Sequence, residues 1–135
     1  MEPQSSTGKL VVAIRYIVKD IESSVAFYTR LLGFEVKIQV KGAFAHLTLG
    51  DLHLFINQPG AGGAGQSMPD GTKPTPGGWN RFQIQVNNLE HVYDKLKSSG
   101  AAFRNEIVTG VGGKQVLLID PSGNLVELFE PITQQ

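Results

Sequence analysis

The chain has 135 residues, of which 41% are hydrophobic and 18% charged, proportions that suit one globular domain or two small modules sharing a core. Its 12 Lys and Arg residues balance 12 Asp and Glu residues, so a basic surface for nucleic acid is not expected. The sequence has no cysteine, which excludes disulfides and thiolate chemistry. No signal peptide is visible, and no apolar run approaches the ~20 residues of a membrane helix. We therefore expect a soluble, cytoplasmic protein without a nucleic-acid or membrane partner.

The first part of the chain predicts a strand, a helix and three further strands. Residues 1–8 are polar and are expected to form a disordered lead. A helix is expected between Asp20, a good N-cap, and Gly33, a natural C-terminal stop, because apolar residues recur at helical spacing between them. The strands are expected over residues 9–18, 34–40, 43–49 and 52–57.

The second part repeats this order after a long interruption. Residues 58–78 are rich in glycine and proline and have no apolar periodicity, which is typical of a linker or a lid. A second helix is expected from the N-cap Asn88 to Gly100. The strands of this part are expected over residues 81–86, 102–109, 114–119 and 124–130.

Two segments of the first part also recur in the second. Residues 17–22 (Ile-Val-Lys-Asp-Ile-Glu) correspond to 85–90 (Gln-Val-Asn-Asn-Leu-Glu), and residues 50–55 correspond to 123–129 with one residue inserted. The sequence therefore predicts an α+β fold made of two βαβββ modules produced by internal duplication. The first module, the segment between the modules and the second module are assigned to residues 9–57, 58–78 and 79–135.

Three motifs carry a resemblance to a known family. They are Lys19-Asp20-Ile21-Glu22 leading to Phe27-Tyr28, then Leu31-Leu32-Gly33-Phe34, and finally Asp120-Pro121-Ser122-Gly123-Asn124 followed by Glu127-Leu128. With them the chain resembles the vicinal oxygen chelate superfamily, which includes glyoxalase I, fosfomycin-resistance transferases, extradiol dioxygenases and bleomycin-resistance proteins. The resemblance implies a curved, mainly antiparallel sheet around a cleft, with the helices outside. It also implies a homodimer whose modules pair across the subunits.

Metal-dependent members of this superfamily carry a ligand at the start of each module's first strand, usually histidine, and one on each module's last strand, usually glutamate. Matching those positions gives Ala13 and Arg81 for the first strands and His53 and Glu127 for the last strands. Ala13 and Arg81 are not metal ligands, and a guanidinium beside Glu127 would neutralise the carboxylate and repel a cation. We therefore expect a metal-free cleft without a cofactor. The alternative is one divalent metal (Zn, Ni, Mn or Fe) held by a set that includes His53 and Glu127.

Strand alternation extends the expected cleft from these four positions. The resulting surface combines arginines, glutamines, one carboxylate, imidazoles and aromatic side chains, which suits a polar or anionic organic molecule with an apolar body. The expected ligand-binding residues are Arg15, Ile17, His46, His53, Phe55, Trp79, Arg81, Gln83, Gln85, Glu127 and Phe129.

Several of these residues keep two interpretations. Glu127 lies between apolar neighbours and needs a partner, so it is either a structural carboxylate tied to Arg81 or a ligand contact or general base. His46 and His53 are either packed residues of the cleft wall or proton-transfer groups. Trp79 is either a lid aromatic that stacks on the ligand or an anchor for the preceding loop.

Three function hypotheses follow. The first is a protein like the glyoxalase and bleomycin-resistance proteins that sequesters a small anionic or aromatic molecule in a metal-free cleft. The second is an enzyme, a lyase, isomerase or dioxygenase, in which Glu127 and His53 are catalytic, with a divalent metal or as bases. The third is an assembly module with a vestigial cleft, which has no positive support in the sequence. We favour the first, because the departures at Ala13 and Arg81 are read directly from the sequence.

Overall fold

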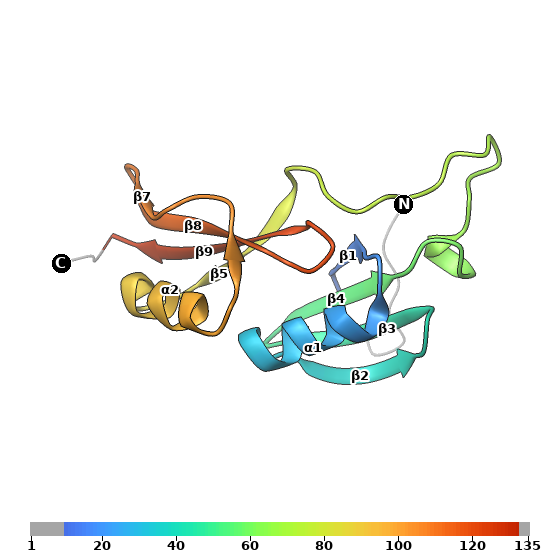
Figure 1. Cartoon of the computed structure of the whole chain (residues 1–135), viewed down its shortest axis with the longest axis horizontal. Coiled ribbons are helices and arrows are strands. Elements are labelled where there is room, and N and C mark those ends of the chain that lie inside the picture. Colours follow the sequence, from blue (N-terminus) through green and yellow to red (C-terminus); the bar gives the residue numbers. More distant parts are fainter. Residues whose placement is uncertain (1–9, 133–135) are drawn as a thin grey trace.

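The structure, a computed structural model, describes residues 10–132 (Figure 1). The disordered lead expected over residues 1–8 lies outside the described residues. The first module contains β1 (Ala13–Ile17), α1 (Ile21–Leu32), β2 (Glu35–Val40), β3 (Phe44–Leu49) and β4 (Leu52–Asn57). A short 3₁₀ turn, η1 (Gly63–Gly65), lies in the connecting segment. The second module contains β5 (Arg81–Gln85), α2 (Leu89–Ser98), β6 (Ala102–Phe103), β7 (Val108–Thr109), β8 (Gly113–Ile119) and β9 (Leu125–Pro131).

Each module forms its own sheet with the same plan. The first sheet has the strand order β1-β4-β3-β2, and the second has the order β5-β9-β8-β6, with β7 also paired to β8. In each sheet the strand before the helix is parallel to the last strand of the module, and the other pairs are antiparallel. The predicted α+β fold class is confirmed. No helix within residues 10–132 is long and apolar enough to cross a membrane.

The helices begin where the sequence predicts and end at or within two residues of the predicted glycines, because their end signals are local. The Asp20 carboxylate accepts a hydrogen bond from the Ser23 amide at 2.8 Å, and Asn88 accepts one from the His91 amide at 3.2 Å. Gly33 adopts φ 79°, which a residue with a side chain rarely adopts, and its amide donates to a carbonyl of the last turn. α1 therefore leads directly into β2.

Two strands differ from the prediction by more than one residue at an end, and both differences come from strand pairing. The strand expected over 9–18 begins at Ala13, because β1 pairs only with β4 and the register starts at Ala13 opposite His53. The single strand expected over 102–109 is divided into β6 and β7. Five residue steps from Phe103 to Val108 oppose only three from Leu118 to Gln115 on β8, so the register cannot continue across the gap.

One hydrophobic core joins the two modules. The Phe82 ring of β5 lies 5.5 Å from the ring of Tyr16, 6.5 Å from that of Tyr28 and 6.1 Å from that of Phe34, all in the first module. Figure 1 shows the modules side by side, with the β8–β9 hairpin reaching from the second module towards β1. The helix-covered faces of both sheets therefore face this shared core, and their other faces are left open.

The turn between β8 and β9 fastens the second module to α1. Asp120 is buried, and its carboxylate accepts hydrogen bonds from the amides of Ser122 and Asn124, both at 2.8 Å, and from the Tyr28 hydroxyl at 2.8 Å. Burial, and then the charge of Asp120, raise the pKa of Tyr28 well above its usual value. The Asn124 side chain also donates to the Ile17 carbonyl at 2.8 Å. The two open faces are thus held in a fixed relation by this turn.

Candidate functional site

Five of the predicted site residues lie on the open face of the first sheet. Alternation along β1, β3 and β4 turns side chains such as Leu47 and Leu54 into the core and leaves their neighbours on the other face. The strand register places Arg15 and His46 on either side of Phe55. The open face carries Arg15, Ile17, His46, His53 and Phe55, all half-buried or exposed.

Four of these side chains form a continuous stack across the strands. The His46 ring lies 5.2 Å from the His53 ring and 4.4 Å from the Phe55 ring, with an angle of only 14° to the latter. The Arg15 guanidinium lies 5.2 Å from the centre of the Phe55 ring. Arg15 also donates a hydrogen bond to the Asn57 side chain. Each group in the stack therefore fixes the orientation of the next.

The two histidines form a polar pair inside this stack. His46 Nε2 lies 2.9 Å from His53 Nδ1, a hydrogen-bond distance that needs one nitrogen protonated and the other unprotonated. Burial, and then the proximity of His53 and Lys37, lower the pKa of His46 below its usual value. The His46 ring is therefore neutral at pH 7, and the contact between the rings joins one donor nitrogen to one acceptor nitrogen.

A pocket of about 470 Å³ opens beside the Arg15 end of the stack. It is mostly apolar, and among residues 10–132 Arg15 is the only charged side chain that lines it. Among residues 10–132 no carboxylate forms an ion pair with Arg15. The pocket is lined by Arg15, Val40, Ala43, Phe44, Phe55, Asn57, Gly62, Gly63 and Ala64. It therefore combines one cationic group with an aromatic and aliphatic wall.

The segment between the modules supplies one wall of this pocket. Gly60 donates to the Gly65 carbonyl at 2.8 Å, which closes a small loop over η1. A Cβ atom at Gly65 would lie 2.1 Å from the Gln58 carbonyl oxygen, so only glycine fits there. The Gln58 side chain in turn accepts a hydrogen bond from the Ile21 amide at 3.0 Å. The start of the segment is thus fastened to the first module next to the pocket.

A second cluster surrounds Glu127 on the open face of the second sheet. Arg81 donates from Nε at 3.0 Å and from Nη2 at 2.9 Å, both to Oε1 of Glu127. Gln83 donates to Oε2 at 2.9 Å, and Gln85 supports Gln83 at 3.2 Å. Glu127 is only 9% exposed, and both of its oxygens are engaged. The predicted Arg81 partner is therefore present, although its two nitrogens share one oxygen instead of taking one each.

Trp79 and Phe129 lie apart from the Arg15 pocket. The Arg104 guanidinium lies over the Trp79 ring, 4.2 Å from the ring centre. The backbone carbonyl of Trp79 accepts a hydrogen bond from Arg81 Nη1 at 3.3 Å. Phe129 is half-buried on β9, opposite Gln85. Among residues 10–132 no hydrogen bond or ion pair joins the first-sheet cluster to the Glu127 cluster. Within one chain the predicted cleft residues thus form two separate clusters, one on each sheet.

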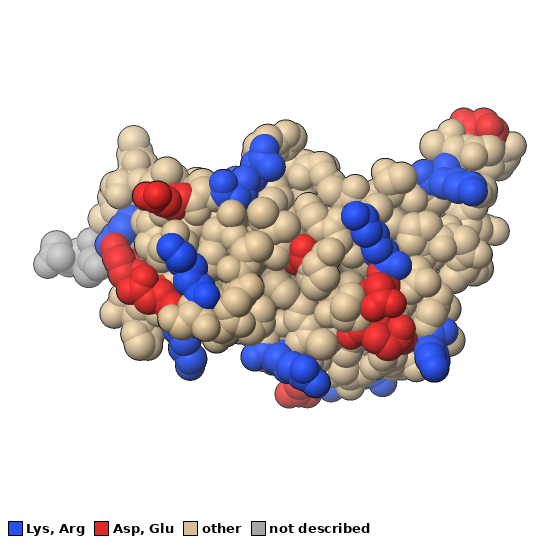
Figure 2. Space-filling view, viewed as in Figure 1, with Lys and Arg blue, Asp and Glu red and all other residues tan. Residues whose placement is uncertain are grey.

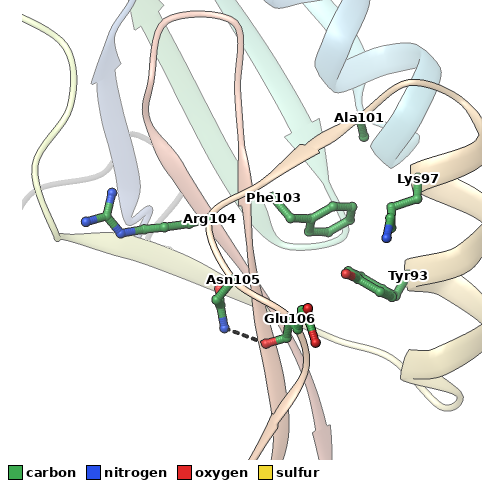
Figure 3. Close-up of a pocket in the computed structure, with 7 residues that line it drawn as sticks. All are labelled: Tyr93, Lys97, Ala101, Phe103, Arg104, Asn105 and Glu106. Carbon is green, nitrogen blue, oxygen red and sulfur yellow. Dashed lines mark hydrogen bonds between the residues drawn. The ribbon is translucent and has the colours of Figure 1, made fainter.

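A further pocket, on the outside of the second module, contains none of the predicted site residues (Figure 3). It lies between α2 and β6, where the Tyr93 and Phe103 rings meet edge to face at 4.7 Å. Lys97 lies 5.1 Å from the centre of the Tyr93 ring. Figure 2 shows basic and acidic side chains mixed over the face in view, in agreement with the balanced charge of the chain.

Comparison with known proteins identifies the family. The profile of the Glyoxalase/Bleomycin resistance protein/Dioxygenase superfamily matches residues 10–128, and the chain belongs to this superfamily. A lactoylglutathione lyase from Agrobacterium tumefaciens has a similar structure, with a TM-score of 0.71 and 16% identity over 93% of this chain and 96% of that one. An antibiotic-binding protein from a Streptomyces species, TnmS3, has a TM-score of 0.68 and 20% identity over 91% and 96%. At these identities the likeness to the two structures concerns the fold alone. The match to the family profile confirms the predicted family resemblance.

The metal that some members of this family use does not fit the residues of this chain. Ala13 offers no donor atom, and the Arg81 guanidinium occupies Oε1 of Glu127 where a cation would bind. Gln83 occupies the other oxygen. His53 bonds to His46 instead. Among residues 10–132 no group of three or more His, Asp and Glu side chains is arranged to hold a metal ion.

Sequence reasoning missed Asn57, the side chains of Val40, Ala43 and Phe44, and the Gly62–Ala64 wall of the pocket. Asn57 alternates with His53 and Phe55 on β4, so it belongs to the same face, and its burial at 4% exposure is unusual for an amide. That alternation was the signal in the sequence that could have identified Asn57 as a residue of the site. Nothing in the sequence of the Gly-rich segment indicates which residues it would touch.

Proposed function

We propose that this protein sequesters a small organic anion with an apolar or aromatic body in the pocket beside Arg15, without turnover and without a metal at Glu127. The contrast between the two arginines carries the proposal. Arg81 is neutralised by Glu127 at 2.9 Å, whereas Arg15 has only the Asn57 amide and the Phe55 ring as partners among the described residues. A guanidinium held beside apolar walls favours a carboxylate or phosphate as its partner.

The walls of the pocket support an apolar ligand body. Phe44 and Phe55 present aromatic surface, and Val40 and Ala43 present aliphatic surface beside Arg15. The volume of about 470 Å³ lies in the range of small-molecule sites, roughly 300–1,000 Å³. An apolar body packed against Val40, Ala43 and Phe44, with its anionic group towards Arg15, would contact both kinds of surface.

The proposal includes a homodimer in the cytoplasm, as the family resemblance and the composition predict. In such a dimer the second module of one subunit would close over the first-sheet pocket of its partner. Two open faces that carry separate polar clusters support this arrangement. Size-exclusion chromatography with light scattering gives the subunit number directly.

One observation supports an enzyme as the second candidate. The hydrogen-bonded pair of His46 and His53 lies on the same face as the pocket and contains an imidazole with a lowered pKa, which suits a general base. Glu127 suits that role less, because both of its oxygens already accept hydrogen bonds. An enzyme of this kind would consume its ligand, and a sequestering protein would return it unchanged.

Isothermal titration with a panel of aromatic carboxylates and their neutral amides tests the proposal. We expect carboxylates to bind and the matching amides to bind at least about tenfold more weakly, since one charge-assisted hydrogen bond contributes roughly 1.5–3 kcal/mol. Arg15→Ala should abolish the preference for the carboxylate, and Arg30→Ala, on the exposed end of α1, should leave it intact. Equal binding of acid and amide would refute the proposal. Mass spectrometry of the recovered ligand separates sequestration from turnover.

A further inference from the structure

We propose that the pocket between α2 and the segment that connects β6 with β7 binds a small zwitterion, an α-amino acid with an apolar side chain. Its volume of about 470 Å³ lies within the roughly 300–1,000 Å³ of small-molecule sites. Among residues 10–132, none lines both this pocket and the pocket beside Arg15. The proposal therefore does not depend on the sequestering function.

Two aromatic rings and one small side chain form the apolar wall of this pocket. The Tyr93 and Phe103 rings lie 4.7 Å apart at an angle of 61°, an edge-to-face contact that orients both rings. Both rings and Ala101 are half-buried and pack against the hydrophobic core. The wall is therefore held in place, and the small side chain of Ala101 leaves room beside Phe103 for a branched aliphatic group.

The opposite wall is the segment that interrupts the strand between β6 and β7. Its four residues, 104–107, oppose only two residues of β8. The Arg104 amide donates to the Leu117 carbonyl at 2.8 Å, and the Asn105 side chain accepts from the Leu117 amide at 3.0 Å. Asn105 also donates to the Glu106 carbonyl at 2.8 Å. Bulges of this kind commonly re-aim a side chain at a functional site, and this one places Glu106 at the pocket.

Two opposite charges face this pocket without pairing with each other. Lys97 lies on α2, 5.1 Å from the centre of the Tyr93 ring, and Glu106 lies on the connecting segment (Figure 3). Within the described part of the chain neither side chain belongs to an ion pair. The Arg104 guanidinium extends away from the other side chains and lies over the Trp79 ring. The pocket therefore presents one cationic and one anionic group to a ligand.

A molecule that carries both charges fits this arrangement better than an ion of either sign. Its carboxylate would pair with Lys97 and its ammonium with Glu106, each through charge-assisted hydrogen bonds. In Figure 3 the Tyr93 hydroxyl lies between the two charged ends, where it can donate to the carboxylate or accept from the ammonium. A simple anion would be repelled by Glu106, and a simple cation by Lys97. An α-amino acid carries both charges and an apolar group for Phe103 on one carbon.

Amide chemical shifts of the ¹⁵N-labelled protein during titration with L-leucine test the proposal. We expect the largest changes at Tyr93, at Phe103 and along residues 104–107, which surround the pocket. L-Leucinamide lacks the carboxylate and N-acetyl-L-leucine lacks the ammonium. Each should bind at least about threefold more weakly than leucine, since each loses one contact between unlike charges at a partly exposed site.

Two charge variants assign the two ends of the ligand. Lys97→Met should remove the preference for leucine over leucinamide, because the partner of the carboxylate is gone. Glu106→Gln should remove the preference for leucine over N-acetyl-leucine, because the partner of the ammonium is gone. The matched controls Lys95→Met and Asp94→Asn change exposed charges of α2 that do not line this pocket, and they should keep both preferences.

A steric variant and an Arg15 variant complete the test. Ala101→Leu fills the pocket without removing a charge and should abolish leucine binding, with circular dichroism to verify that the variant folds. Arg15→Ala should bind leucine as the wild type does, which separates this site from the proposed sequestering site. Equal binding of leucine and its two derivatives would overturn the inference. So would the absence of shift changes around the pocket, or a loss of leucine binding in Arg15→Ala.

Discussion

Replacing Arg81 with alanine isolates the charge that keeps Glu127 in place. The variant leaves a carboxylate that is only 9% exposed without its cation. Removing one partner of a buried ion pair costs about 3–5 kcal/mol, but here the Arg81 side chain is 28% exposed and Gln83 keeps its bond to Oε2 at 2.9 Å. We therefore expect a loss of about 2 kcal/mol, which corresponds to a fall in Tm of roughly 6–10 °C for a chain of this size.

Urea unfolding at pH 7 measures this loss, and the exposed pair of Lys114 and Glu90 provides the matched control. These side chains are 36% and 55% exposed at 2.7 Å, so Lys114→Ala should destabilise the chain much less than Arg81→Ala does. The double variant Arg81→Met with Glu127→Leu should recover more than half of the loss, because no charge is left unpaired. If Arg81→Ala costs no more than Lys114→Ala, the carboxylate does not depend on the guanidinium, and the reasoning fails.

Three further predictions concern the supports of the site. Tyr28→Phe removes the hydroxyl that donates to the buried Asp120 carboxylate at 2.8 Å and should cost about 1–3 kcal/mol in urea unfolding, whereas a change below 0.5 kcal/mol would show that the contact contributes little. Because the pKa of His46 is lowered in the folded chain, the contribution of this ring to stability is present above the usual histidine pKa of ~6.5 and is lost as the pH falls through the lowered value. The Tm of the wild type should therefore fall more between pH 7 and 5 than the Tm of His46→Gln. Parallel curves of Tm against pH for the two proteins would contradict this. Gly65→Ala would place a Cβ atom 2.1 Å from the Gln58 carbonyl oxygen and should weaken ligand binding by displacing the pocket wall, while unchanged affinity would show that the wall does not contact the ligand.

The helices and the faces of the strands could be predicted because their causes are local. Asp20 and Asn88 cap the helices through contacts three residues away, and alternation alone shows which side chains share a face of a strand. The pairing of Arg81 with Glu127 was one of two interpretations of Glu127, and it came from matching both residues to the ligand positions of the resembled family; the structure contains this pair.

The features that the sequence did not predict depend on partners far away in the chain. The division of β6 from β7 follows from a count of residues against β8, and Asn105 replaces a backbone partner there by accepting from the Leu117 amide at 3.0 Å. The bond between His46 and His53 depends on the diagonal offset of β3 and β4. Neither relation can be read before the registers are known.

The placement of the Arg15 and Glu127 clusters on separate sheets also depends on contacts between distant parts of the chain. The sequence predicted one cleft containing both arginines, and within a single chain the structure gives each arginine its own sheet. The contacts of Phe82 with Tyr16 and Tyr28 set this arrangement, because they join the helix-covered faces of both modules. Apolar periodicity shows which face of a strand or helix is buried, but not which element packs against that face. The sequence therefore could not show which faces of the two modules would meet.

The most direct test of the account is a map of where an aromatic carboxylate binds. Amide chemical shifts of the ¹⁵N-labelled, untagged protein during titration with 2-naphthoate give this map residue by residue. The account predicts that the largest changes occur at Arg15, Phe55 and Asn57 and along the loop from Gly62 to Ala64, which line the pocket. Changes centred instead on Arg81, Gln83 and Glu127 would contradict it, because they would show that the ligand binds where the account finds the charges already paired.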